Sequence, residues 1–204
     1  SGEGGGERIP LRALQNRGID YLALGHEHAY RCEPLDRRGV WAYAGCPEGR
    51  GFDECGEKGY ILLDTEADVE ARVTFCPVAK RTLHEIALDV TGCDTLHDMC
   101  ARQNDAVRGI PATDMVKVVL TGALSPEVTC DVVHLQKLLA EQFYFARVKN
   151  HTTLAITPED YAHDISLKGE FVRLVLASGL DEEVKMQVIE KGIRALGGEE
   201  VDAE

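Results

Sequence analysis

The sequence predicts an α+β protein, and three patterns lead to this fold class. Short apolar runs separated by glycine-containing turns fill residues 8–80, which is typical of strands. Strand-like and helix-like periods then alternate over residues 81–157 in the order β-α-β-α-β. Apolar residues at helical spacing dominate residues 158–204. We therefore expect three domains, 1–80, 81–157 and 158–204.

The first domain is expected to begin with a flexible Gly/Glu-rich lead-in over Ser1–Glu7. Pro10 suits the first turn of a helix that would reach Arg17, with Gly18 as its stop. Five residues, Asp20–Leu24, read as a buried strand, and Gly25 is expected to bend the chain as it leaves the sheet. The later elements are a hairpin of 29–35 with 40–44, a loop over 47–57, and two antiparallel strands, 59–64 and 71–78, that close the sheet.

The second domain is a small α+β unit. Its predicted strands cover 83–90, 115–121 and 143–149, and its predicted helices cover 94–107 and 131–141. Thr95 and Asp98 stand at the spacing of a capping box at the start of the first helix.

The third domain should contain two helices. Leu167, Phe171, Leu174 and Val175 form one apolar stripe, and a second runs from Leu180 to Leu196. The stripes either pack against each other as a helical hairpin or leave a docking face, which would include Val184 and Ile193, for a partner protein.

Composition and charge narrow the class of protein. With 44% apolar and 28% charged residues the chain is globular. A net charge of −13 disfavours a basic DNA-coating surface, so any DNA contact would be local, around Arg31, Arg37, Arg38 and Arg50. We expect no membrane segment, because no run approaches bilayer length, and a cytoplasmic location, because nothing in the sequence indicates export. The 7 cysteines, odd in number and without a C-x-x-C pair, fit a reducing compartment.

Two histidines follow the first predicted strand. His26 and His28 are two residues apart, and in extended backbone such residues share a face. Paired imidazoles suit Mn, Fe or Zn, although two nitrogens do not complete a coordination sphere. The other histidines are dispersed and are expected to be surface or hydrogen-bonded residues: His84, His97, His134, His151 and His163.

Three short motifs follow in order: Gly25-His26-Glu27-His28, Gly45-Cys46-Pro47-Glu48 and Lys58-Gly59-Tyr60. This succession resembles the closing motifs of calcineurin-like metallophosphoesterases, and most of all the DNA-repair exonuclease branch with its SbcD-like nuclease subunit. The resemblance is strong over residues 8–80 and holds only in outline beyond them. It implies that residues 1–80 are the C-terminal part of a phosphoesterase β-sandwich, followed by a capping domain and a helical tail.

The resemblance also implies a chemistry. The intact protein would be a hydrolase that cleaves DNA phosphodiesters with two divalent ions, Mn²⁺ above all, with His26 on one metal and His28 on the other. The family's earlier motifs, D-x-H and G-N-H-[D/E], have no counterpart here. We therefore expect a C-terminal fragment that binds metal weakly or not at all and is inactive alone. Its tail would engage an SbcC-like ATPase, and exposed sandwich area could be covered in a homodimer.

The loop over 47–57 has two interpretations. It is either a solvated connector or an active-site wall that brings Arg50, Asp53 or Glu54 near a phosphodiester. Two other functions also stay open for the whole chain. One is a non-catalytic interaction module for the ATPase, and the other is a zinc-stabilised domain that uses His26, His28 and two of the nearby cysteines, Cys32, Cys46 and Cys55.

Overall fold

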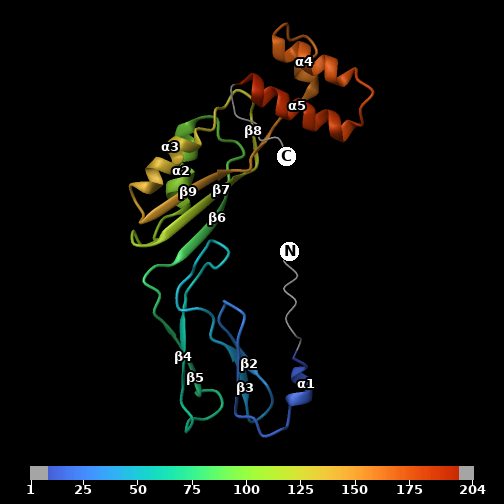
Figure 1. Cartoon of the computed structure of the whole chain (residues 1–204). Helices are drawn as coiled ribbons and strands as arrows, with labels where there is room; N and C mark the ends of the chain where they lie inside the picture. The colour runs from blue at the N-terminus through green and yellow to red at the C-terminus, as the bar shows by residue number, and fades with distance from the viewer. Residues whose placement is uncertain (1–8, 198–204) are drawn as a thin grey trace. The chain divides into compact units, whose positions relative to one another are not determined.

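The computed structural model describes residues 9–197, so the predicted lead-in over Ser1–Glu7 lies outside the described residues (Figure 1). The chain is α+β, as the sequence predicts. It divides into two compact units. The first comprises residues up to 85 together with 113–115, and the second comprises 86–112 and the residues from 116 onward. The division falls within one strand, at Glu85 and Ile86, a few residues beyond the predicted boundary at 80.

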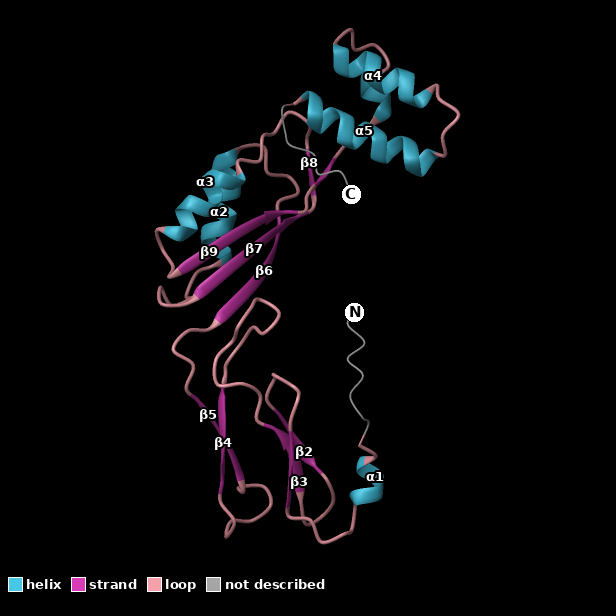
Figure 2. Cartoon of the chain, in the orientation of Figure 1, coloured by secondary structure: helices cyan, strands magenta, loops and turns pink. Residues whose placement is uncertain are grey.

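The first unit consists mainly of short strands joined by long loops (Figure 2). Its elements are α1 (Leu11–Leu14), β1 (Tyr21–Leu24), β2 (Arg31–Pro34), β3 (Val40–Tyr43), β4 (Gly59–Leu63) and β5 (Val73–Pro77). Strand β1 runs parallel to β3, and β2 forms the predicted antiparallel hairpin with β3. The β3 strand is the most buried of the three, with Val40, Trp41 and Ala42 in the core.

Strand β1 confirms the predicted strand but not its predicted burial. The sheet order is β1-β3-β2, so within the described chain β1 has one hydrogen-bonded neighbour and lies at an edge. Its side chains are half-buried or exposed. Strongly apolar strands of this kind are usually covered on both faces, and the residues described here do not provide that cover.

Strands β4 and β5 were expected to close the same sheet, and that prediction is wrong. They pair antiparallel, as predicted, but as a separate two-stranded sheet. Two residues of β4 leave large side chains in solvent, with Tyr60 50% and Leu62 57% exposed. The alternating pattern that identified the strands says nothing about which neighbour each one pairs with.

The predicted helix over Pro10–Arg17 is also shorter in the structure. Helix α1 ends at Leu14 because Gln15 is already extended and Asn16 has a positive φ of 59°. Asn tolerates this left-handed conformation better than most residues do. The chain therefore turns before Gly18, which had been expected to stop the helix.

The second unit begins with the predicted β-α-β-α-β order. Its elements are β6 (Leu83–Asp89), α2 (Leu96–Ala106), β7 (Met115–Thr121), β8 (Ala123–Leu124), α3 (Val132–Ala140), β9 (Phe145–Asn150) and β10 (Thr153–Leu154). The main sheet has the order β6-β7-β9, and both helices contribute buried side chains to one core with it, among them Met99 and Leu135. The capping box is confirmed: the Thr95 hydroxyl accepts from the Asp98 backbone, and the Asp98 carboxylate accepts from the Thr95 backbone. The two-residue pair β8–β10 was not predicted.

The tail folds as a helical hairpin with its own small core. It contains η1 (Pro158–Tyr161), α4 (Leu167–Leu176) and α5 (Glu182–Leu196). Val172 and Val175 of α4 pack with Ile189 and Ile193 of α5. The predicted α4 stripe is therefore partly wrong, because Leu167 and Leu174 are 69% and 67% exposed. None of the helices in the part of the chain that the structure describes combines the length and the apolar character needed to cross a bilayer.

Candidate functional site

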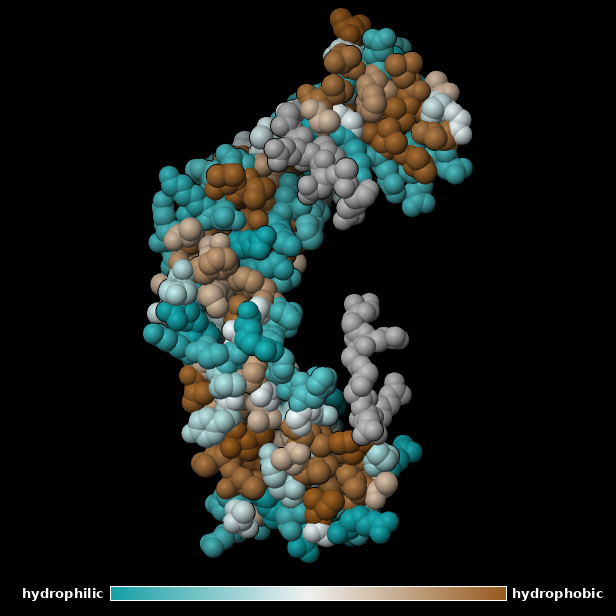
Figure 3. All heavy atoms as spheres, in the orientation of Figure 1, coloured by the Kyte–Doolittle hydropathy of each residue, from teal (hydrophilic) through white to brown (hydrophobic). Residues whose placement is uncertain are grey.

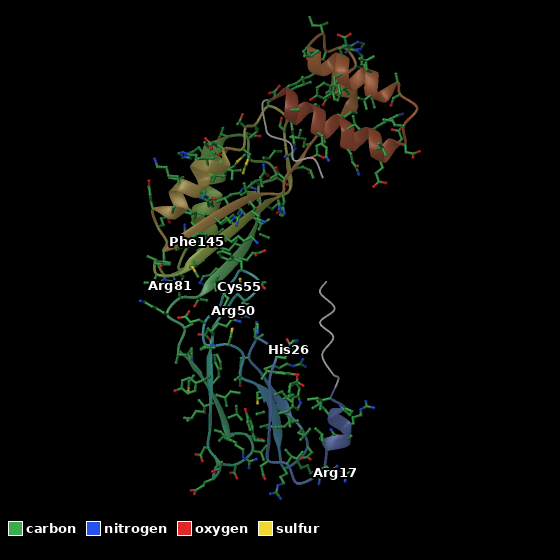
Figure 4. All side chains as sticks on the ribbon, in the orientation of Figure 1. Arg17, His26, Arg50, Cys55, Arg81 and Phe145 are labelled. Carbon is green, nitrogen blue, oxygen red and sulfur yellow. The ribbon has the colours of Figure 1, made fainter. Side chains whose placement is uncertain are left out.

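The first unit carries a hollow of about 320 Å³ just beyond the end of β1. Two segments line it: residues 26–29, and a group from the loop between β3 and β4 that comprises Asp53, Glu54, Cys55 and Lys58. Figure 4 labels His26, Arg50 and Cys55 in this part of the first unit. The structure thus brings both predicted metal ligands, His26 and His28, to the same hollow as Asp53 and Glu54.

The bend after β1 lies at a different residue from the predicted one. Gly25 was expected to make the sharp bend, but the residue with the unusual conformation is His26, at φ 86°. A positive φ strains the backbone of a residue other than glycine, typically by about 1–3 kcal/mol, and such strain is found most often at functional sites. The prediction that His26 and His28 share a face assumed extended backbone, so its premise does not hold at His26.

All three sequence motifs meet at the main-chain oxygen of His28. The Lys58 ammonium donates to this oxygen at 3.0 Å, and the Cys46 backbone N–H donates to it at 3.3 Å. The Cys46 thiol lies 3.5 Å from the same atom. Lys58 is only 4% exposed, and a buried ammonium is tolerated where such hydrogen bonds compensate its lost hydration. The segment after β1 is therefore held by residues from both later motifs.

Gly45 has a second, steric role in the same place. Its φ is 78°, and a Cβ added there would lie 2.9 Å from the His28 oxygen and 3.0 Å from the Tyr30 nitrogen. Only glycine combines that conformation with so close an approach to a neighbouring backbone. The first glycine of Gly45-Cys46-Pro47-Glu48 thus lets this segment pack against the loop that carries His28.

Glu54 is the buried carboxylate of the hollow, with 9% of the residue exposed. Its Oε1 lies 2.5 Å from His28 Nδ1 and 3.0 Å from Arg50 Nη2, and its Oε2 accepts the Arg50 backbone N–H at 2.9 Å. Hydrogen bonds from the Arg50 side chain, the Arg50 backbone and His28 lower the pKa of Glu54 to about 2. The carboxylate is thus ionised at neutral pH and fully engaged within the protein.

Arg50 combines a fixed position with an exposed side chain. Its Nη2 lies 2.9 Å from His28 Nδ1 and 3.2 Å from His28 Nε2, so the guanidinium sits against the imidazole between the two nitrogens. The hydrogen bond to Glu54 raises the pKa of Arg50 above its ordinary value. Because 69% of its side chain is exposed, the group can turn toward a ligand in solvent without crossing the core.

The donor set fits part of a metal centre. Imidazole nitrogens are good ligands for Mn, Fe and Zn, and His26 and His28 both line the hollow. Within residues 9–197, however, no group of three or more His, Cys, Asp or Glu side chains is arranged to hold a metal ion. Cys55 lines the hollow and Cys46 lies beside it, 3.8 Å from the Glu54 carboxylate. The zinc-stabilised alternative therefore stays a prediction, and metal analysis of chelator-free protein is its test.

The four arginines expected near DNA differ in their surroundings, and Arg37 is exposed in the turn between β2 and β3. Arg31 donates to the Glu33 carboxylate and lies 5.0 Å from the centre of the Trp41 ring, and Arg38 donates to Asp20 at 2.9 Å. Both are therefore engaged within the hairpin region. Arg50 is the arginine of the predicted set that lies next to the hollow.

The sequence did not indicate the roles of Lys58 and Glu54. The sequence identifies Lys58 only as the first residue of Lys58-Gly59-Tyr60, and it offers Glu54 as one of three loop residues near a phosphodiester rather than as a partner of His28. No local pattern distinguishes Lys58 from an exposed lysine, because the strand that follows it leaves Tyr60 and Leu62 in solvent. Searched against known families, the chain matches no family model.

Lys58→Met should destabilise the first unit by about 1.5–3 kcal/mol, the usual worth of a hydrogen bond to a charged donor. Methionine keeps the apolar stem and removes the ammonium that holds the His28 oxygen. Denaturant unfolding checks this, with the exposed Lys80→Met as the matched control. Equal stability of the two variants would contradict the role assigned to Lys58.

Proposed function

We propose that this chain is the C-terminal part of a calcineurin-like metallophosphoesterase of the DNA-repair exonuclease branch. The observation that carries the proposal is the convergence of three motifs on one residue. Residues from Gly45-Cys46-Pro47-Glu48 and Lys58-Gly59-Tyr60 hold the His28 backbone, and Gly25-His26-Glu27-His28 supplies two imidazoles to the adjoining hollow. Motifs that are separate in the sequence thus act on one site, which supports a shared function.

The intact protein would hydrolyse DNA phosphodiesters. In this class of enzyme two divalent ions, here proposed as Mn²⁺, activate a water molecule and stabilise the leaving oxygen. From this chain, His26 and His28 would each donate a ring nitrogen. The remaining ligands would come from protein outside these 204 residues, since the earlier family motifs are not found among them.

Arg50 is the residue of this chain best suited to bind the substrate. Its guanidinium is exposed, stays charged and lies beside the hollow, and guanidinium groups bind phosphate oxygens through paired hydrogen bonds. Asp53 lines the hollow and is exposed to solvent. Glu54, in contrast, has both oxygens occupied, so we assign it no contact with the phosphodiester.

The chain by itself should show no metal-dependent cleavage of a DNA duplex or of an activated phosphodiester, because two imidazoles do not make a binuclear centre. The measurement is turnover with Mn²⁺, with and without EDTA. The parent protein, in contrast, should cleave DNA. His28→Ala should lower its rate by more than the roughly 10–100-fold that loss of an outer partner costs.

Glu57→Ala is the matched control for both assays, since Glu57 is exposed in the same loop and lies outside the hollow. EDTA-sensitive turnover by the isolated chain would contradict the expected inactivity. A parent protein that cleaves DNA equally well with and without His28 would overturn the proposed function.

A second candidate function is a docking module for an SbcC-like ATPase. The observation that favours it is the apolar surface of the helical hairpin, visible as brown atoms over α4 and α5 in Figure 3. Leu174 is 67% and Val184 40% exposed, although the hairpin has its own core. Ile193, which the sequence had offered to the same docking face, is 2% exposed and belongs to that core.

Leu174→Asp combined with Val184→Asp should abolish capture of a purified SbcC-like ATPase subunit, because the two charges would have to be desolvated at the contact. Gln187→Asp adds one charge at another exposed position of α5 and should leave capture unchanged. Circular dichroism checks that each variant is folded. Undiminished capture by the double variant would exclude this surface.

A further inference from the structure

Both carboxylate oxygens of Glu54 are engaged by neighbouring groups of the protein. One oxygen serves His28 Nδ1 and the Arg50 guanidinium, and the other serves the Arg50 backbone and lies near the Cys46 thiol. The side chain is 8% exposed. A carboxylate enclosed in this way can orient the groups that donate to it. Of these groups, His28 lines the hollow.

The contact with Glu54 determines which nitrogen of His28 carries the proton. An ionised carboxylate can only accept hydrogen bonds, so a 2.5 Å contact requires a proton on Nδ1. In a neutral imidazole the other nitrogen, Nε2, then has a free lone pair. This is the less common tautomer of an exposed histidine in water, so the protein must impose it.

A second histidine of the first unit shows the opposite arrangement. His84 Nε2 lies 2.9 Å from the Asp114 carboxylate, whose residue is 6% exposed. By the same argument His84 carries its proton on Nε2. The chain thus contains two carboxylate–histidine pairs with opposite tautomers, and the two can be compared within one molecule.

We propose that Glu54 is a positioning residue for His28. It orients the ring and fixes the proton on Nδ1, so that Nε2 can present its lone pair to a divalent cation in the hollow. Histidines that bind metals characteristically donate their second nitrogen to such a carboxylate, which fixes the tautomer and raises the basicity of the ligand. The identity of the cation rests on the proposed function, whereas the tautomer does not.

Arg50 is the second group held by Glu54 in this arrangement. Its Nη2 is 2.9 Å from His28 Nδ1 and 3.2 Å from His28 Nε2. A guanidinium can only donate, so with the proton on Nδ1 it can donate only to Nε2, and a cation at Nε2 requires it to turn aside. Glu54 keeps a hydrogen bond to the Arg50 backbone at 2.9 Å, which does not depend on where the side chain points. Glu54 can therefore hold His28 while Arg50 moves.

The test is ¹H–¹⁵N correlation spectroscopy of the histidine rings in the ¹⁵N-labelled chain, at a pH about two units above the ordinary histidine pKa of about 6.5. His28→Gln assigns the His28 signals by their loss. We expect His28 with its proton on Nδ1 and His84 with its proton on Nε2. Glu54→Ala should shift most of the His28 population to the Nε2–H form.

Two further variants and an internal reference separate a positioning role of Glu54 from general damage to the fold. Glu54→Gln keeps an oxygen that can accept from Nδ1–H and should preserve the tautomer. Glu57→Ala removes an exposed glutamate from the same loop and should change nothing. His84 reports in every sample that the first unit is folded. A proton on Nε2 of His28 in the unaltered chain, or an unchanged tautomer in Glu54→Ala with His84 intact, overturns the proposal.

Addition of Zn²⁺ to the same samples tests the cation separately. Zinc is diamagnetic, so a ligand nitrogen stays observable. A shift of His28 Nε2 that needs roughly 10–100-fold more zinc in Glu54→Ala supports the positioning role and the metal site together. If the chain has the expected tautomer but the His28 Nε2 signal does not shift on addition of zinc, His28 is not a metal ligand. Glu54's control of the tautomer is still supported in that case.

Discussion

The hydrogen bonds to the main-chain oxygen of His28 are the constraint on which the site depends. Lys58 and Cys46 both donate to that oxygen, from segments that are 30 and 18 residues distant in sequence. These two hydrogen bonds fix the backbone of His28 shortly after the chain leaves β1. Glu54 fixes the His28 ring through its contact with Nδ1. The protein thereby holds both the backbone and the side chain of His28. His26 differs in having a positive φ of 86°.

The arrangement contains two buried charges of opposite sign, and each depends on its hydrogen-bond partners. Lys58 is 4% and Glu54 9% exposed, and each would be costly to bury without its partners. The ammonium finds the His28 carbonyl, and the carboxylate finds Arg50 and His28. Loss of one partner would leave a buried charge uncompensated, which is strongly destabilising.

The sequence predicted the elements better than it predicted their neighbours. Periodicity and capping located α2, α3 and α5 and most strands to within a few residues, because these depend on local patterns. The pairing of β4 with β5 in a sheet of their own depends on contacts between distant segments, which no local pattern encodes. The same limit explains Leu167 and Leu174: a helical stripe identifies apolar residues but not the partner that covers them.

The candidate site divides in the same way. His26 and His28 could be identified from spacing, and the motifs that follow them indicated a common family. Glu54 could not be distinguished from Asp53 in the sequence, since burial alone separates two adjacent acids of one loop. The positive φ of His26 was equally hidden, because the glycine beside it was the natural candidate for the bend.

The most direct test of the central claim is paramagnetic broadening of the histidine ring signals by a small amount of Mn²⁺. The chain has 7 histidines, so five rings serve as internal references for the pair at the hollow. The account predicts that His26 and His28 broaden first and together, and that His84 and the remaining rings follow only at much higher Mn²⁺. Broadening that reaches His97, His134, His151 or His163 as early as the pair would contradict the assignment of a metal site to this hollow.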